Sequence, residues 1–144
     1  RNSETHAWGA PAALRIEGGS FGFQIGASET DVVMLLMDPR SVQGILSSKF
    51  TLGGDADVAA GPVGRSTTAQ TDATMRAKIL SYSRSRGVFA GVALTGATIR
   101  QDLDENNAMY GRKWTTKEIV EERKVAPPRA AEELIDLLTK YSQG

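Results

Sequence analysis

The sequence predicts an α+β fold: a curved or barrel-like, mainly antiparallel β-sheet with short helices and a C-terminal amphipathic helix packed on it. Strand-like segments fill the chain up to about residue 100, and helical periodicity replaces them from there to the C-terminus. Glycines and prolines separate the strand-like segments, as turns between strands require. The chain has 144 residues, of which 40% are hydrophobic and 24% charged, as in an ordinary globular domain. We therefore expect a single domain over residues 1–144.

Five segments carry the strand pattern. Two short strands are predicted at 11–16 and 20–25, on either side of a glycine pair. The continuous apolar run at 31–37 has the length of a strand and predicts a central strand that is buried on both faces. A long strand-like stretch at 67–84 and another at 88–99, joined by a short turn, predict a hairpin.

The clearest alternation lies between residues 75 and 84. Met75, Ala77 and Ile79 share one parity and are expected to face the core. The side chains of the other parity are mainly basic, and they are Arg76, Lys78, Leu80, Tyr82 and Arg84. One face of the sheet is therefore expected to be basic.

Helix start and stop signals place the helices. Asp38 before Pro39 predicts the start of a short helix. Asp102 predicts the start of a second helix that ends at Gly111, and Thr115 with Glu118 has the spacing of a capping box. Pro128 opens the last helix, whose apolar stripe is expected to pack on the sheet and consists of Leu134, Leu137, Leu138 and Tyr141.

Catalytic chemistry has little support in the sequence. The only histidine, His6, lies in a polar N-terminal stretch, there is no cysteine, and no serine lies in a G-x-S-x-G motif. Asp55 and Asp57 are expected to be solvated, although a deep pocket joining one of them, or Asp72, to a basic residue would favour an enzyme. We therefore predict that the protein is not an enzyme and needs no cofactor.

A metal site is not expected either. Asp102, Asp104 and Asn106 match the first ligand positions of an EF-hand loop, but Asn107 and Lys113 replace its glycine and its bidentate glutamate. The same residues fit a helix N-terminus better. Nucleic acid is not an expected partner, because the 17 basic and 17 acidic residues give zero net charge.

The segment 65–100 nevertheless has a local charge of +5. It contains one acid, Asp72, and six bases, namely Arg65, Arg76, Lys78, Arg84, Arg86 and Arg100. Such a stripe attracts phosphorylated headgroups or an acidic protein surface. A solvated face balanced by acidic C-terminal helices is an equally good interpretation of the pattern. Arg65 also follows the turn 61–64, where free backbone N–H groups could meet an anion.

Two long motifs resemble a known family. Residues 54–65 (GDADVAAGPVGR) and 79–92 (ILSYSRSRGVFAGV) resemble the two signatures of the SYLF family. Residues 18–26 (GGSFGFQIG) resemble its glycine-rich opening strands, and Tyr110-Gly111 its tail. The resemblance runs from about Trp8 to Tyr141. SYLF domains usually begin earlier, with a helical segment, so we expect a member that lacks the N-terminal part of the domain.

The resemblance implies binding rather than catalysis. Eukaryotic members bind phosphoinositide-rich membrane and actin filaments, whereas a lone domain like this one is similar to bacterial members, which are often exported or lipid-anchored. We therefore expect an anionic-lipid-binding module in the bacterial cell envelope, or else on the cytoplasmic face of a membrane. Its predicted contact residues are Arg65, Arg76, Lys78, Tyr82, Arg84 and Arg86. The alternative is a protein-interaction domain that binds a filament such as actin or another acidic protein surface, or a structural envelope protein.

Overall fold

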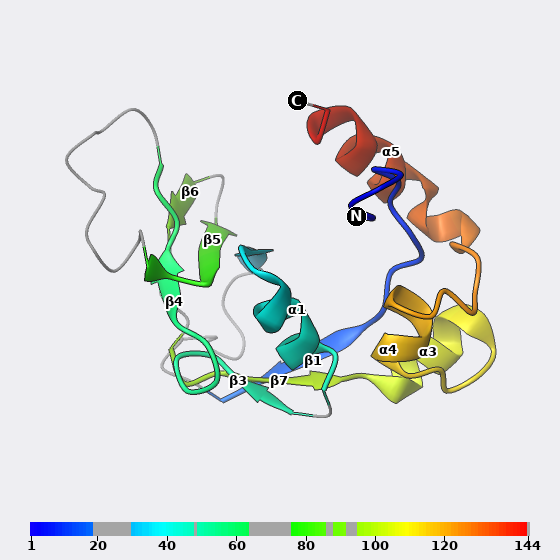
Figure 1. Ribbon diagram of the computed structural model, residues 1–144, viewed down its shortest axis with the longest axis horizontal. Coiled ribbons are helices and arrows are strands. Elements are labelled where there is room, and N and C mark those ends of the chain that lie inside the picture. The colour runs from blue at the N-terminus through cyan, green and yellow to red at the C-terminus, as the bar shows by residue number, and fades with distance from the viewer. Residues whose placement is uncertain (19–29, 48, 64–75, 86–87, 92–94, 144) are drawn as a thin grey trace. The chain divides into compact units, whose positions relative to one another are not determined.

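A computed structural model of the chain confirms the α+β class and describes residues 1–18, 30–47, 49–63, 76–85, 88–91 and 95–143 (Figure 1). The chain forms two compact units. One consists of Arg1–Arg15 with Gln101–Gly144, and the other of Ile16–Arg100. We call them the terminal unit and the central unit.

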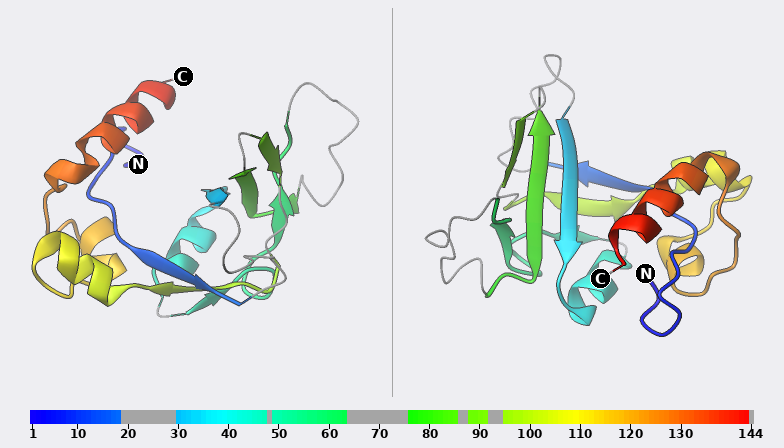
Figure 2. Two further views of the ribbon diagram at one scale, coloured as in Figure 1. Left: turned by 180° about the vertical axis from the view of Figure 1, so that it is seen from behind. Right: turned by 90° about the horizontal axis from the view of Figure 1, so that it is seen from above.

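The described strands form two small open sheets. The first has the order β1-β7-β3, formed by Leu14–Glu17, Thr98–Gln101 and Phe50–Thr51. The second, called sheet B here, has the order β2-β5-β4, formed by Thr30–Leu36, Ile79–Ser85 and Val58–Ala60, and β6 (Val88–Gly91) also pairs with β5. In the described residues β5 is antiparallel to β2 and β6 and parallel to β4, and the sheets do not close into a barrel (Figure 2).

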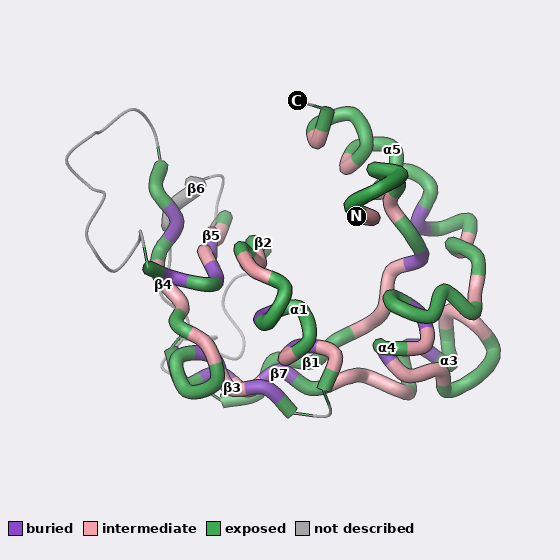
Figure 3. Tube along the Cα trace, viewed as in Figure 1, coloured by how far each residue is buried: buried purple, intermediate pink, exposed green. Residues whose placement is uncertain are grey.

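The core of the central unit lies against the inner face of sheet B. Its buried side chains come from α1 (Pro39–Ile45), β3, β5 and the segment around β7, and they are Ile45, Phe50, Leu52, Ile79, Ala97 and Ile99 (Figure 3). Asp38 caps α1 as predicted, by accepting a hydrogen bond of 2.9 Å from the Ser41 backbone N–H. Gly44 has to be a glycine, because a Cβ there would overlap the ring of Phe50.

The two signature motifs of the sequence meet in sheet B. The first contains β4 and the second contains β5, and the two strands pair in parallel from Val58 beside Ile79 onward. Directly after β4, a Cβ on Gly61 would overlap the ring of Tyr82. The Tyr82 hydroxyl donates a hydrogen bond of 3.1 Å to the carbonyl oxygen of Pro62. The glycine of one motif and the tyrosine of the other are therefore complementary in shape.

Three strand predictions need correction. The run 31–37 is not buried on both faces, because alternate residues of β2 are exposed and only the others reach the core. The predicted strand 88–99 is two strands, β6 and β7, in different sheets; Gly96, with φ +91°, lies in the turn before β7. Within the stretch 67–84 the described strand begins only at Ile79. The predicted strand 20–25 lies outside the described residues, whereas the β5–β6 hairpin is confirmed.

The helices of the terminal unit begin where the caps predict. The carboxylate of Asp102 accepts the Glu105 N–H at the start of α3 (Leu103–Tyr110), which ends at Gly111 with φ +72°. Thr115 and Glu118 form the capping box of α4 (Thr116–Val120). Lys113, which stands at the position of the EF-hand glutamate, pairs with Asp104 at 3.3 Å.

A buried asparagine joins distant segments of the terminal unit. The side chain of Asn106 is fully buried, accepts a hydrogen bond of 2.7 Å from the Ala13 N–H and donates one of 2.9 Å to the Trp114 carbonyl oxygen. At the end of the unit, the indole N–H of Trp8 donates to the Ser142 hydroxyl at 3.0 Å. The N-terminal segment is thus held by side chains from α3 and from the residue after the last helix.

The last helix exposes most of its apolar stripe. After a single 3-10 turn, η2 (Arg129–Ala131), α5 runs over Glu132–Tyr141. No residue of α5, which the structure describes in full, is buried, and Leu134, Leu137 and Tyr141 are 50%, 44% and 76% exposed. Within the terminal unit this stripe is therefore not buried, and its packing on the sheet stays a prediction. Periodicity predicts an apolar helix face, but it does not say what covers that face.

Candidate functional site: the outer face of sheet B

The outer face of sheet B carries residues from β2 and β5 in direct register. Asp31 lies opposite Arg84, Val33 opposite Tyr82, and Leu35 opposite Leu80. Directly opposed residues of an antiparallel pair point to the same side of the sheet. Because Val32, Met34 and Leu36 pack against the core, these opposed pairs occupy the other, outer face.

An apolar row follows β2 along this face. Val33, Leu35 and Met37, which comes directly after the strand, are 53%, 46% and 58% exposed. Single exposed apolar residues are common on protein surfaces, but a contiguous group of large ones marks an interaction site more often. We call these three residues the β2 row. Sequence reasoning missed them, because the uninterrupted apolar run 32–37 gives no alternation from which an exposed face could be recognised.

The basic residues beside the β2 row are partly neutralised. The guanidinium of Arg84 lies 3.2 Å from the Asp31 carboxylate, and the Lys78 ammonium lies 3.8 Å from that of Asp38. All four groups keep contact with solvent, so these pairs remain accessible to a binding partner. Hydrogen bonding with Ser41, and then the charges of Lys78 and Arg40, lower the pKa of Asp38. The partner of Lys78 therefore stays ionised at neutral pH.

The structure brings together only part of the predicted lipid-contact set. Tyr82 and Arg84 share the outer face, although Tyr82 is half-buried and its hydroxyl is bonded to Pro62. Lys78 lies directly before β5, and its ammonium pairs with Asp38. Arg76 is exposed, but it lies before β5 in a helical turn, so its assignment to the strand by parity is wrong. Arg65 and Arg86 lie outside the described residues.

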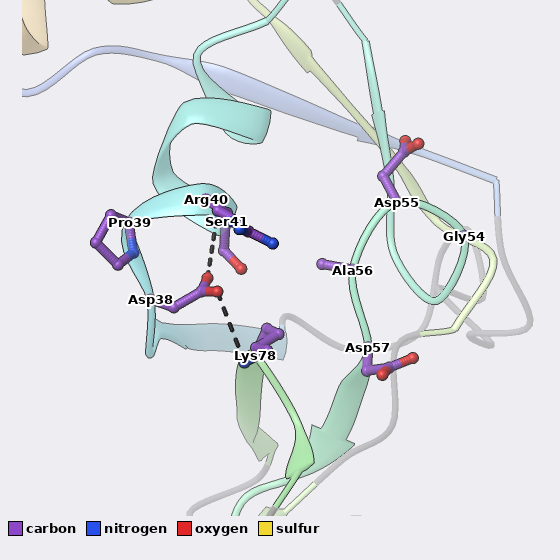
Figure 4. A pocket seen from close by; sticks show the side chains of 9 residues that line it. All are labelled: Asp38, Pro39, Arg40, Ser41, Gly54, Asp55, Ala56, Asp57 and Lys78. Atoms are coloured by element: carbon purple, nitrogen blue, oxygen red, sulfur yellow. Dashed lines mark hydrogen bonds and ion pairs between the residues drawn. The ribbon is translucent and has the colours of Figure 1, made fainter.

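A pocket of about 650 Å³ opens where Lys78 meets α1 (Figure 4). Its lining includes Asp55 and Asp57, together with the cations Arg40 and Lys78. Figure 4 shows that both carboxylates point away from the Asp38–Lys78 pair, and one oxygen of Asp55 accepts the Thr51 N–H at 2.7 Å. The carboxylates of Asp55 and Asp57 therefore do not converge on the Asp38–Lys78 pair.

Other signs of chemistry are weak in the part of the chain that the structure describes. His6 is exposed, as predicted, and Asp72 lies outside the described residues. Among the described residues no group of three or more histidines, cysteines and acids could hold a metal ion. None of the helices described there has the length and apolar composition that crossing a membrane requires.

The family is settled by comparison with known proteins. Residues 17–141 match the family model Ysc84, described as "Las17-binding protein actin regulator". The chain belongs to the Ysc84 family. The SYLF resemblance expected from the two signature motifs is thereby confirmed. The description of this family names an actin regulator.

Several relatives are similar over nearly the whole chain. Protein YSC84 of Saccharomyces cerevisiae is 36% identical over 134 residues, which are 91% of this chain and 28% of that protein. LAS seventeen-binding protein 3 of the same yeast is also 36% identical, and SH3 domain-containing YSC84-like protein 1 of Rattus norvegicus is 32% identical over 137 residues, 40% of its length. The chain thus spans well under half of the relatives named here. No solved structure matches the chain.

Proposed function

We propose that this chain is a non-catalytic protein-binding module that attaches to an actin-type filament through the outer face of sheet B. The family description names an actin regulator, which supports a protein partner of this kind. The observation that carries the proposal is the β2 row, three apolar side chains exposed on the face that also carries the Asp31–Arg84 ion pair. Protein interfaces combine an apolar centre with a polar, charged rim.

The same face favours a protein partner over a lipid headgroup. A headgroup of high negative charge is attracted by uncompensated cations. Here Arg84 and Lys78 each lie beside a carboxylate, which reduces the net attraction of the face for a polyanion. Packing an apolar row against a complementary protein surface, in contrast, lowers the free energy because it removes apolar area from water. Anionic lipid, the partner ranked first from the sequence, therefore becomes the second candidate. The predicted location in the bacterial cell envelope stays a prediction.

The test is co-sedimentation of the chain with purified actin filaments, in parallel with vesicles of neutral and of anionic lipid. We expect saturable binding to filaments that decreases only moderately between 50 and ~200 mM salt, because apolar burial is not screened. Binding to neutral vesicles should be absent. Saturable binding to anionic vesicles with no binding to filaments would overturn the proposal in favour of the lipid candidate. Binding to neither would overturn both.

A further inference from the structure

The C-terminal helix carries a second exposed apolar surface, which belongs to the terminal unit. Leu134, Leu137 and Tyr141 follow one another at intervals of three and four residues. This is the spacing that brings side chains onto one stripe of an α-helix. All three are exposed, so the structure describes a continuous apolar seam on α5.

A neighbouring row of side chains, on α5 and directly after it, already contacts the rest of the terminal unit. Ile135 and Ser142 lie seven residues apart and are both half-buried, and the Ser142 hydroxyl accepts the indole N–H of Trp8. The terminal unit therefore contacts one side of α5 and leaves the adjacent seam exposed. The helix is held in place by its own unit while the seam stays accessible.

The charges beside the seam are arranged with opposite signs at its two ends. Glu133 precedes Leu134, and Lys140 precedes Tyr141, so an acid and a base occupy equivalent places seven residues apart. Both are exposed. Two such helices packed antiparallel would bring the Glu133 of each chain near the Lys140 of the other, whereas in a parallel pair these positions lie on opposite sides of the seam and make no such contact. The seam is thus complementary to itself in one orientation.

We propose that α5 is the interface of a homodimer, in which two copies of the chain pack their α5 helices antiparallel about a two-fold axis near Leu137. Leu134 of one copy then lies opposite Tyr141 of the other, and two Glu133–Lys140 contacts flank the seam. A twofold arrangement uses the same surface on both copies, which a self-complementary seam satisfies. An anionic membrane is a poorer occupant, because Glu132, Glu133 and Asp136 lie on the same helix.

The interface is short, so the association is weak. A ten-residue helix buries far less surface than a stable dimer needs, and we expect a dissociation constant on the order of 100 μM. Sedimentation equilibrium from about 10 μM to 1 mM protein covers this range. We expect a concentration-dependent monomer–dimer equilibrium in the wild type. Leu137→Gln should weaken it about tenfold or more, since this residue lies at the axis and counts twice.

The charges give the sharper test. Lys140→Glu and Glu133→Lys should each weaken association at least about threefold at low salt, because each creates two like-charge contacts. An equimolar mixture of these two variants should recover wild-type association, since all contacts between the different chains are then of opposite sign. Glu132→Lys, on the face of the same helix opposite the seam, serves as the control. Circular dichroism checks that each variant keeps its fold.

Three results would overturn the proposal. A wild-type chain that remains monomeric up to about 1 mM has no such dimer. A dimer that is unaffected by Leu137→Gln uses another surface. A dimer that needs Leu137 but is not restored in the mixture of charge variants has a different orientation. Because none of these measurements uses a filament or a lipid, the outcome is independent of the function proposed for sheet B.

Discussion

The guanidinium of Arg84 lies 3.2 Å from the carboxylate of Asp31, which is its directly opposed residue on the neighbouring strand. The charge of β5 that stands out in the sequence is therefore partly balanced from β2. Both side chains are well exposed, at 64% and 72%, so the pair contributes little to the stability of the fold. The pair matters instead for the binding proposed for this face, because it lowers the net positive charge beside the β2 row.

This pair predicts the effect of Asp31→Asn. Removing the carboxylate leaves Arg84 uncompensated, so binding to acidic actin filaments should tighten by about two- to fivefold at low salt. The gain should disappear at high salt, and the free energy of unfolding should change by less than about 0.5 kcal/mol. Co-sedimentation at two salt concentrations measures the first effect, and urea denaturation the second. Weaker binding by Asp31→Asn would show that the carboxylate itself contacts the partner.

The contact between Gly61 and Tyr82 predicts a coupled pair of substitutions. Gly61→Ala places a methyl group where the Tyr82 ring lies, which should cost about 1–3 kcal/mol of stability. In a Tyr82→Ala background the same change should cost much less, because the space is then free. A double-mutant cycle by urea denaturation measures the coupling. Additive effects would mean that Gly61 is required for its backbone conformation alone.

Burial predicts which apolar residues stabilise the fold. Ile79 is fully buried in the core of the central unit, so Ile79→Ala should cost about 2–5 kcal/mol. Leu137→Ala, at an exposed position of α5, should cost less than about 1 kcal/mol at protein concentrations at which the chain is monomeric. Thermal or urea unfolding at a few micromolar protein compares the two. Equal losses would contradict the exposed position of the α5 seam.

The capping box of α4 predicts a pH effect of known sign. Hydrogen bonds from the Thr115 backbone and hydroxyl, followed by that from Lys124, lower the pKa of Glu118 in the folded chain. A lowered folded-state pKa stabilises the fold above the unfolded pKa of ~4.3, and this stabilisation is lost as the pH falls through the folded value. Glu118→Gln should therefore be less stable than wild type at pH 7, and the difference should shrink in acid. A difference that grows in acid would contradict this assignment.

The contribution of the Thr115 side chain to this capping box is tested at constant pH. Thr115→Ala removes the acceptor of the Glu118 N–H and should cost about 0.5–2 kcal/mol. Thr115→Ser keeps the hydroxyl and should retain most of the stability. The two variants are compared by urea denaturation at pH 7, and a Thr115→Ser protein as unstable as Thr115→Ala would show that the methyl group, and not the cap, is required.

Local signals in the sequence predicted the helices well. The starts of α1, α3 and α4 depend on a hydrogen bond between residues three apart, at Asp38, Asp102 and Thr115, and such contacts need no knowledge of the tertiary fold. The β5–β6 hairpin was predictable for the same reason, because its strands are close in sequence. The division of 88–99 into two strands in different sheets was not, since it depends on which distant strand each half meets.

The site was predictable only in part. Strand parity placed Tyr82 and Arg84 correctly on one face, but it could not show that Asp31 lies opposite Arg84, because this pairing joins residues 53 positions apart. It also failed for the β2 row, where apolar composition suggested burial on both faces. Burial is a property of what packs against a strand, so composition alone could not reveal that Val33 and Leu35 face solvent.

The central claim is that the β2 row binds the filament, and one comparison of co-sedimentation tests it most directly. The triple variant Val33→Thr, Leu35→Gln, Met37→Gln removes the row; its matched control, Val42→Thr, Val63→Thr, Val120→Thr, changes three other exposed apolar residues, which are 39%, 46% and 44% exposed. Both should keep the wild-type circular dichroism. We predict that the row variant loses actin-filament binding by about tenfold or more while the control binds like wild type. Full binding by the row variant, or equal loss in both variants, would contradict the account.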